Sequence, residues 1–267
     1  MPDRGAGRAG SFFRAFWDCL WSDRVGGMAA EVAFYAVLSL FPGLLVAASA
    51  LGQLERFAGR DLAERARVQV VGFMDAILTE RAANVVQAVN DLFTEGSGGL
   101  FTTAVVLSIY TMSAGLMAAI SAMDRIYGVA EERPWWRRRL VAICLSLGSA
   151  LLLAALLALV LLGPVLGGGA ELVLAAFLVL VLWATTLYQV GPAGRRSWLG
   201  SLPGGILAAA LWLAGSYGLK FYVWMSYGGN SVLGAVGGGL ILMMWAYILC
   251  YVLLLGAEVN RLLSRPS

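Results

Sequence analysis

Six apolar stretches dominate this sequence, and each is close to the roughly 20 residues that a helix needs to cross a membrane. The chain is 60% hydrophobic and 13% charged, whereas an average soluble domain is about 45–50% apolar and about 25% charged. We therefore expect an all-α integral membrane protein with six transmembrane helices. The expected helices cover residues 29–51, 100–120, 140–162, 172–190, 199–221 and 235–257.

The connections between these stretches alternate in their arginine content. Arginines gather before residue 29, between 121 and 139, at 195–196 and after 258, whereas the connections 163–171 and 222–234 contain no basic residue. Short basic connections stay on the cytoplasmic side of a membrane. The pattern therefore predicts that both termini are cytoplasmic.

One membrane domain is expected over residues 11–263, after a Gly- and Arg-rich segment, 1–10, that we expect to be disordered. The large outer connection, 53–97, has more acids than arginines, and its apolar residues recur at helical spacing, which predicts an amphipathic helical segment. The first apolar stretch begins too late and runs too long for a cleavable signal peptide, so none is expected.

Polar side chains follow one side of the first apolar stretch, and matching polar faces occur in the second and the sixth. Small and hydroxylated residues commonly hold membrane helices together, and the charged ones could form ion pairs that fix helix ends. Alternatively, these faces line a cavity that opens to the inner leaflet. Both interpretations predict a central polar seam or cavity formed by Glu31, Tyr35, Ser39, Pro42, Tyr110, Ser113, Asp124, Tyr247, Tyr251 and Glu258.

Several arginines lie at the predicted cytoplasmic ends of the helices, some of them directly after Trp135 and Trp136. Arginine binds phosphate through two parallel hydrogen bonds, so these residues could hold the headgroup of an anionic lipid. They could equally serve only to anchor the topology. The candidates are Arg125, Arg133, Arg137, Arg138, Arg139, Arg195 and Arg196.

The residue types of this chain give little support for an enzyme. The chain has no histidine, the usual general base and metal ligand, and its three cysteines are far apart. No phosphate-binding loop, hydrolase elbow or zinc-protease motif occurs. We expect no enzyme activity, no cofactor, no metal and no nucleic-acid partner.

The sequence contains four recognisable motifs. They are Ala33–Pro42 (AFYAVLSLFP), Asp124–Val129 (DRIYGV) followed by Arg133, Leu202–Gly205 (LPGG) and, in the last helix, Leu233–Gly238 with Gly256–Asn260 (GAEVN). Together they make the sequence similar to the YihY/virulence factor BrkB family over roughly residues 12–263. The family usually has Asn where this chain has Asp124, which places a charge where an amide is typical.

The resemblance implies a bacterial inner-membrane protein with six helices. The family once carried the label ribonuclease BN, and some members are linked to virulence, serum resistance or envelope lipid export. A ribonuclease is disfavoured here because neither a metal site nor a histidine pair can be assembled. The leading hypothesis is a flippase-like transporter for an anionic, lipid-like envelope substrate, with membrane lipids as partners. The alternative is a scaffold that recruits an envelope protein through 53–97.

Overall fold

The computed structural model describes residues 17, 20, 22–39, 98–162, 169–194, 197–226 and 234–264. Within these ranges every regular element is a helix, which agrees with the predicted all-α class. A shorter apolar helix, Val25–Ser39, comes first. The long helices are α5 (Gly98–Tyr127), α6 (Trp135–Leu162), α7 (Ala170–Val190), α8 (Trp198–Ser226) and α9 (Gly234–Leu263).

Four of the long helices contain a segment long and apolar enough to cross a membrane, by length and composition. These segments are Trp135–Leu156, Ala170–Val190, Trp198–Leu219 and Gly239–Leu263. The long helices cover the second to sixth predicted stretches and extend past several of their ends, because arginine and glutamate continue a helix as readily as leucine does. Asp124 and Glu258 therefore lie inside helices rather than in connections.

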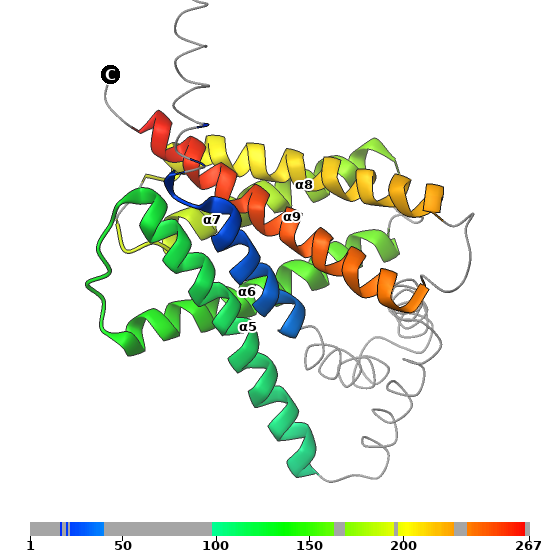
Figure 1. The fold of residues 1–267 in the computed structure, drawn as a ribbon, viewed down its shortest axis with the longest axis horizontal. Helices are drawn as coiled ribbons and strands as arrows, with labels where there is room; N and C mark the ends of the chain where they lie inside the picture. Colours follow the sequence, from blue (N-terminus) through cyan, green and yellow to red (C-terminus); the bar gives the residue numbers. More distant parts are fainter. Residues whose placement is uncertain are drawn as a thin grey trace, which may run out of the picture.

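The five long helices form a closed ring of neighbours. Each contacts the next along the chain, and α9 contacts α5 to complete the ring. In Figure 1 the start of the Val25–Ser39 helix, the end of α5 and the end of α9 gather on the same side of the molecule. We call this side, where α6 and α8 also begin and α7 ends, the charged end.

The buried core lies near the charged end and consists largely of small and aliphatic side chains. The Val25–Ser39 helix contributes Val25, Met28, Ala29 and Val32, with the spacing of one helical face. Within a membrane there is little hydrophobic drive between helices, so close packing of small side chains has to hold them together. The core therefore depends on shape more than on the burial of large residues.

Glycines bring α7, α8 and α9 into close contact. A Cβ atom added at Gly204 of α8 would lie 2.2 Å from the carbonyl oxygen of Gly256 in α9, and one at Gly205 would lie 2.3 Å from Oγ1 of Thr185 in α7. One at Gly256 would collide with the Tyr188 hydroxyl, which donates a 2.6 Å hydrogen bond to the Leu253 carbonyl. Gly204 and Gly256 require glycine because backbone meets backbone there, and Gly205 requires it because the Thr185 side chain lies against it.

Some predicted features lie outside the described residues. They are the N-terminal segment 1–10, the outer segment 53–97, Pro42, Arg195 and Arg196.

Candidate functional site at the charged end

The last turn of α5 ends in a left-handed glycine. Gly128 has a φ of 65°, its N–H bonds to the Arg125 carbonyl, and the N–H of Val129 bonds to the Asp124 carbonyl. These two hydrogen bonds define a Schellman motif, which terminates a helix and satisfies its last carbonyls. The DRIYGV motif is therefore a helix-terminating sequence that directs the connection 128–134 across the charged end.

Arg133 joins this connection to the end of α7. Its guanidinium forms two 2.8 Å hydrogen bonds with the carboxylate of Glu131 and a 2.9 Å hydrogen bond with the Gly191 carbonyl. Asp124 approaches the same guanidinium at 3.9 Å, and its other oxygen accepts a 2.8 Å hydrogen bond from the N–H of Ala193. The connections 128–134 and 191–194 are thus held together by one arginine and two carboxylates.

The two carboxylates respond to this arrangement in opposite ways. Hydrogen bonds from Arg133 lower the pKa of Glu131 to about 2. Burial raises the pKa of Asp124, and the nearby negative charge of Glu131 adds to this effect. The hydrogen bonds to Glu131 in turn raise the pKa of Arg133. Glu131 is therefore the main counter-ion of Arg133, and Asp124 is the carboxylate whose charge is disfavoured.

Arg261 makes a second junction, between α9, α5 and the N-terminal turn. Its Nη1 atom lies 2.6 Å from the carboxylate of Asp23 and 2.7 Å from the carbonyl oxygen of Ile126. Its Nε atom lies 3.1 Å from the carboxylate of Glu258, which is fully buried. A charge as deeply buried as that of Glu258 requires such a partner.

Asn260 makes a third junction, between α9 and α8. Its amide oxygen accepts a 2.7 Å hydrogen bond from the N–H of Gly204, and its amide nitrogen donates a 3.1 Å hydrogen bond to the carbonyl of Ser201. The LPGG and GAEVN motifs therefore meet each other, and both serve helix packing.

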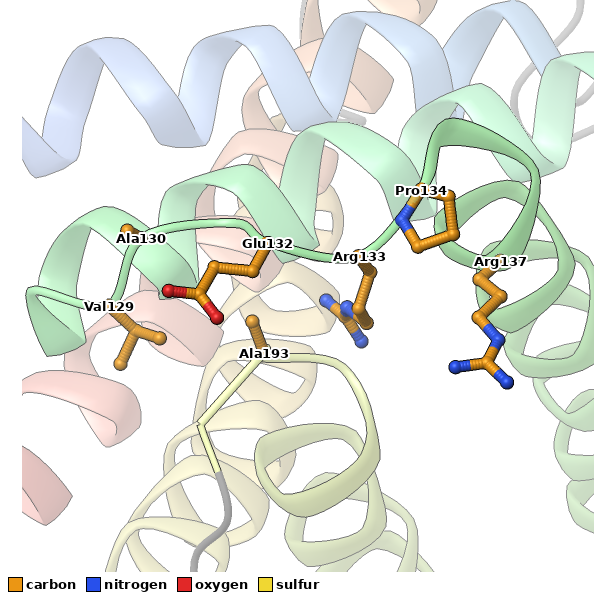
Figure 2. Close-up of a pocket in the computed structure, with 7 residues that line it drawn as sticks. All are labelled: Val129, Ala130, Glu132, Arg133, Pro134, Arg137 and Ala193. Carbon is orange, nitrogen blue, oxygen red and sulfur yellow. The ribbon is translucent and has the colours of Figure 1, made fainter.

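A polar cavity of about 400 Å³ opens beside the Arg133 junction. This volume falls within the range of about 300–1,000 Å³ that ligand sites occupy. Figure 2 shows Glu132, Arg133 and Arg137 extending to the same side of the chain, the side on which Ala193 lies. We call this cavity the arginine pocket; its lining is Val129, Ala130, Glu132, Arg133, Pro134, Arg137 and Ala193.

The four arginines at the start of α6 and just before it have different surroundings. Arg133 is held by Glu131 and Gly191, as described above. Arg138 forms a 3.4 Å ion pair with Glu131 and contacts the Ser121 hydroxyl. Arg139 lies 4.4 Å from the ring centre of Tyr110. Arg137 is exposed, and its guanidinium carbon lies 5.4 Å from the ring centre of Trp136. It makes no ion pair within the described ranges. Of the four, Arg137 is the arginine most accessible to a ligand.

The predicted seam residues are distributed unevenly. Tyr247 and Tyr251 stack on each other with ring centres 5.8 Å apart, and the Tyr247 hydroxyl lies near Gly26. Tyr35 lies against Gly115 of α5. Two of the expected faces thus do meet neighbouring helices.

The remaining described seam residues do not share one site. Ser39 and Ser113 donate hydrogen bonds to carbonyls within their own helices. Glu31 and Tyr110 are exposed, whereas Asp124 and Glu258 belong to separate junctions at the charged end. Arg125 is exposed and does not line the arginine pocket.

Sequence reasoning did not single out Glu131, Glu132 or the turn at 191–194. The run Glu131-Glu132-Arg133 in a short connection was the available signal, since opposite charges two residues apart can pair within a turn. Across the described residues, no group of three or more potential metal-ligating side chains is placed to hold a metal ion.

The sequence matches the virulence factor BrkB family over residues 16–267. The chain belongs to that family. Its relatives include UPF0761 membrane proteins, among them one of Tolumonas auensis that is 30% identical over 96% of this chain and 86% of its own length. A UPF0761 membrane protein of Stenotrophomonas maltophilia is 26% identical over 96% of this chain and 62% of its own.

Another relative of this BrkB-family protein is named ribonuclease-like protein YfkH, from Bacillus subtilis, and is 25% identical over 88% of this chain and 89% of its own length. No solved structure matches the chain. The resemblance stated from the four motifs is therefore confirmed at the level of the family, and the protein is a membrane protein of that family.

Proposed function

We propose that this BrkB-family protein is a non-enzymatic, flippase-like transporter of the bacterial inner membrane, and that it acts on an amphiphile with an anionic phosphate group. The arginine pocket is the proposed headgroup site. Both termini are taken to be cytoplasmic, as the arginine distribution predicts, so the pocket faces the inner leaflet.

The start of α6 carries this proposal. Its first turn has no acidic residue, and the arginines there lie at the positive end of the helix dipole. Each like charge at that end costs about 0.3–1 kcal/mol, whereas an anion would be stabilised. A phosphate in the arginine pocket would offset this repulsion through Arg137 and the helix N-terminus together. Trp135 and Trp136, both exposed, suit the membrane interface on which such a substrate would arrive.

The chain carries no nucleotide-binding motif, so a gradient, a partner protein or mass action would have to drive net movement. A ribonuclease activity is not proposed, because the chain has no histidine and the buried acids Asp124 and Glu258 belong to junctions between helices.

The test is reconstitution of the full chain into vesicles that contain acyl-labelled phospholipids, with the leaflet distribution followed by quenching of the outer label. We expect wild-type protein to accelerate exchange and Arg137→Gln to slow it several-fold. Arg24→Gln is the matched control, because Arg24 is also an exposed arginine at the charged end and lies outside the pocket. Equal exchange with and without protein would refute the proposal and favour the scaffold hypothesis.

A further inference from the structure

We propose that the arginine pocket selects amphiphiles whose headgroup carries an ammonium group beside the phosphate. This inference rests on the proposed function and specifies its substrate class. It follows from which charges in the pocket are already engaged and which remain accessible.

Three of the five N–H groups of Arg133 already have protein acceptors. Its Nε and Nη2 atoms are bonded to Glu131, and Nη2 also bonds to the Gly191 carbonyl. A guanidinium binds phosphate best through two parallel N–H groups, and both N–H groups on this edge of Arg133 face protein acceptors. A phosphate held through two parallel N–H groups in the pocket would therefore depend on Arg137.

Glu132 places a negative charge in the same wall as Arg137. Its carboxylate extends to the same side as the two arginine side chains (Figure 2). Glu132 is exposed and, in the part of the chain that the structure describes, makes no ion pair. A headgroup with only negative charge would be repelled by this carboxylate, whereas an ammonium group has three N–H donors to offer it.

The wider charge balance points the same way. The charged side chains that line the pocket or pair with its lining are two arginines and three carboxylates. They are Arg133, Arg137, Asp124, Glu131 and Glu132, and Arg138 pairs in turn with Glu131. A zwitterionic headgroup leaves this balance unchanged, while a phosphate without a counter-charge adds an unmatched negative charge to a partly desolvated cluster.

The experiment compares two acyl-labelled lipids in vesicles that contain the full chain: phosphatidylethanolamine and phosphatidylglycerol. Acyl labels are needed because a headgroup label would remove the amine. We expect exchange of phosphatidylethanolamine to be two- to fivefold faster, the effect of a partly exposed ion pair. Glu132→Gln should abolish this preference, and Glu171→Gln, which changes an exposed glutamate outside the pocket, should retain it.

Equal rates for both lipids, or a preference that survives Glu132→Gln, would overturn the inference and leave the proposed function intact. Exchange of neither lipid would overturn the proposed function and the inference with it. Soluble phosphoethanolamine forms a separate arm. If soluble phosphoethanolamine slows the exchange of labelled phosphatidylethanolamine as much as unlabelled phosphatidylethanolamine does, the ligand is a soluble amine phosphate and the lipid assignment is wrong. Thermal unfolding of each variant checks that it folds.

Discussion

The side-chain oxygen of Asn260 accepts a hydrogen bond from the backbone N–H of Gly204, so a side chain of α9 bonds directly to the backbone of α8. Pro203, directly before Gly204, has no N–H and disturbs helical pairing at this point. The carbonyl of Ser201, two residues before Pro203, accepts the second hydrogen bond of Asn260. One amide thus satisfies a donor and an acceptor of a neighbouring helix.

Asn260→Ala should destabilise the protein substantially. Asn260 is fully buried, and its removal leaves the N–H of Gly204 and the carbonyl of Ser201 without their partner. Each buried group left unsatisfied costs about 1–3 kcal/mol. Thermal unfolding in detergent measures the loss. Asn260→Asp is the shape-matched comparison: it retains the acceptor but sets a carboxylate oxygen against the Ser201 carbonyl, so it should also destabilise. A melting temperature unchanged by both substitutions would contradict the assigned junction.

Gly204→Ala should be far more damaging than Gly218→Ala, although both lie in α8. The new Cβ at 204 would overlap the carbonyl oxygen of Gly256, whereas nothing lies within 4 Å of a Cβ at 218. At an open helical position alanine is favoured over glycine by about 0.5–1 kcal/mol, so Gly218→Ala should leave stability unchanged or raise it. The two melting temperatures, measured side by side, check the helix contact directly.

Arg261→Met should loosen the charged end. The substitution removes the hydrogen bonds to Asp23 and to the Ile126 carbonyl, and it takes the guanidinium away from the buried Glu258. Breaking a buried ion pair costs about 3–5 kcal/mol. Arg261→Lys should rescue only part of this loss, because one ammonium cannot reproduce the planar fork of a guanidinium. Full rescue by lysine would mean that charge alone matters here.

Glu131→Gln should destabilise the protein near neutral pH and have little effect at low pH. The folded pKa of Glu131 is about 2, below the ordinary value of 4.5, so its contribution is present above pH 4.5 and is lost as pH falls toward 2. The loss at pH 7 should be about 1–2 kcal/mol, the size of a charge-assisted hydrogen-bonded pair. Unfolding curves of wild type and Glu131→Gln between pH 7 and pH 3 should show the difference in their stabilities shrinking as pH falls.

Asp124→Asn should show the opposite pH dependence. The folded pKa of Asp124 is raised above 3.8, so ionised Asp124 opposes folding at neutral pH, and stability is gained as pH falls through the raised pKa. Asparagine retains an oxygen that accepts the hydrogen bond from the Ala193 N–H, and it removes the negative charge that opposes folding. The variant should be at least as stable as wild type at pH 7.5, and the difference should shrink as pH falls below 4. A large loss at pH 7.5 would show that the attraction to Arg133 outweighs burial.

The helical class and most helix positions could be predicted because apolar length is a property of the sequence alone. The lengths of the helices could not be read from hydropathy. The windows stop where charge begins, as at Asp124, whereas the helix continues until Gly128 terminates it. Hydropathy measures transfer to lipid, and helix ends are set by capping.

The candidate site was only partly predictable. The positions of Arg133 and Arg137 at one end of the bundle followed from the topology. Which of the two remains accessible depends on Glu131 and Gly191, and Gly191 lies 58 residues from Arg133. Such pairings require the relative placement of two connections, which no local pattern encodes. The expected polar faces of 29–51 and 100–120 carry hydroxyl groups that bond within their own helices, as at Ser39 and Ser113.

The contact between Gly204 and Gly256 also determines how α8 and α9 can move. The two backbones touch near the charged end, and Asn260 bonds across them there. A rotation of α8 against α9 that preserved this contact would turn about this point. From Gly204 to the end of α8 at Ser226 the helix extends for about 33 Å. A rotation of about 10° would displace the far end by about 6 Å and leave the charged end almost in place.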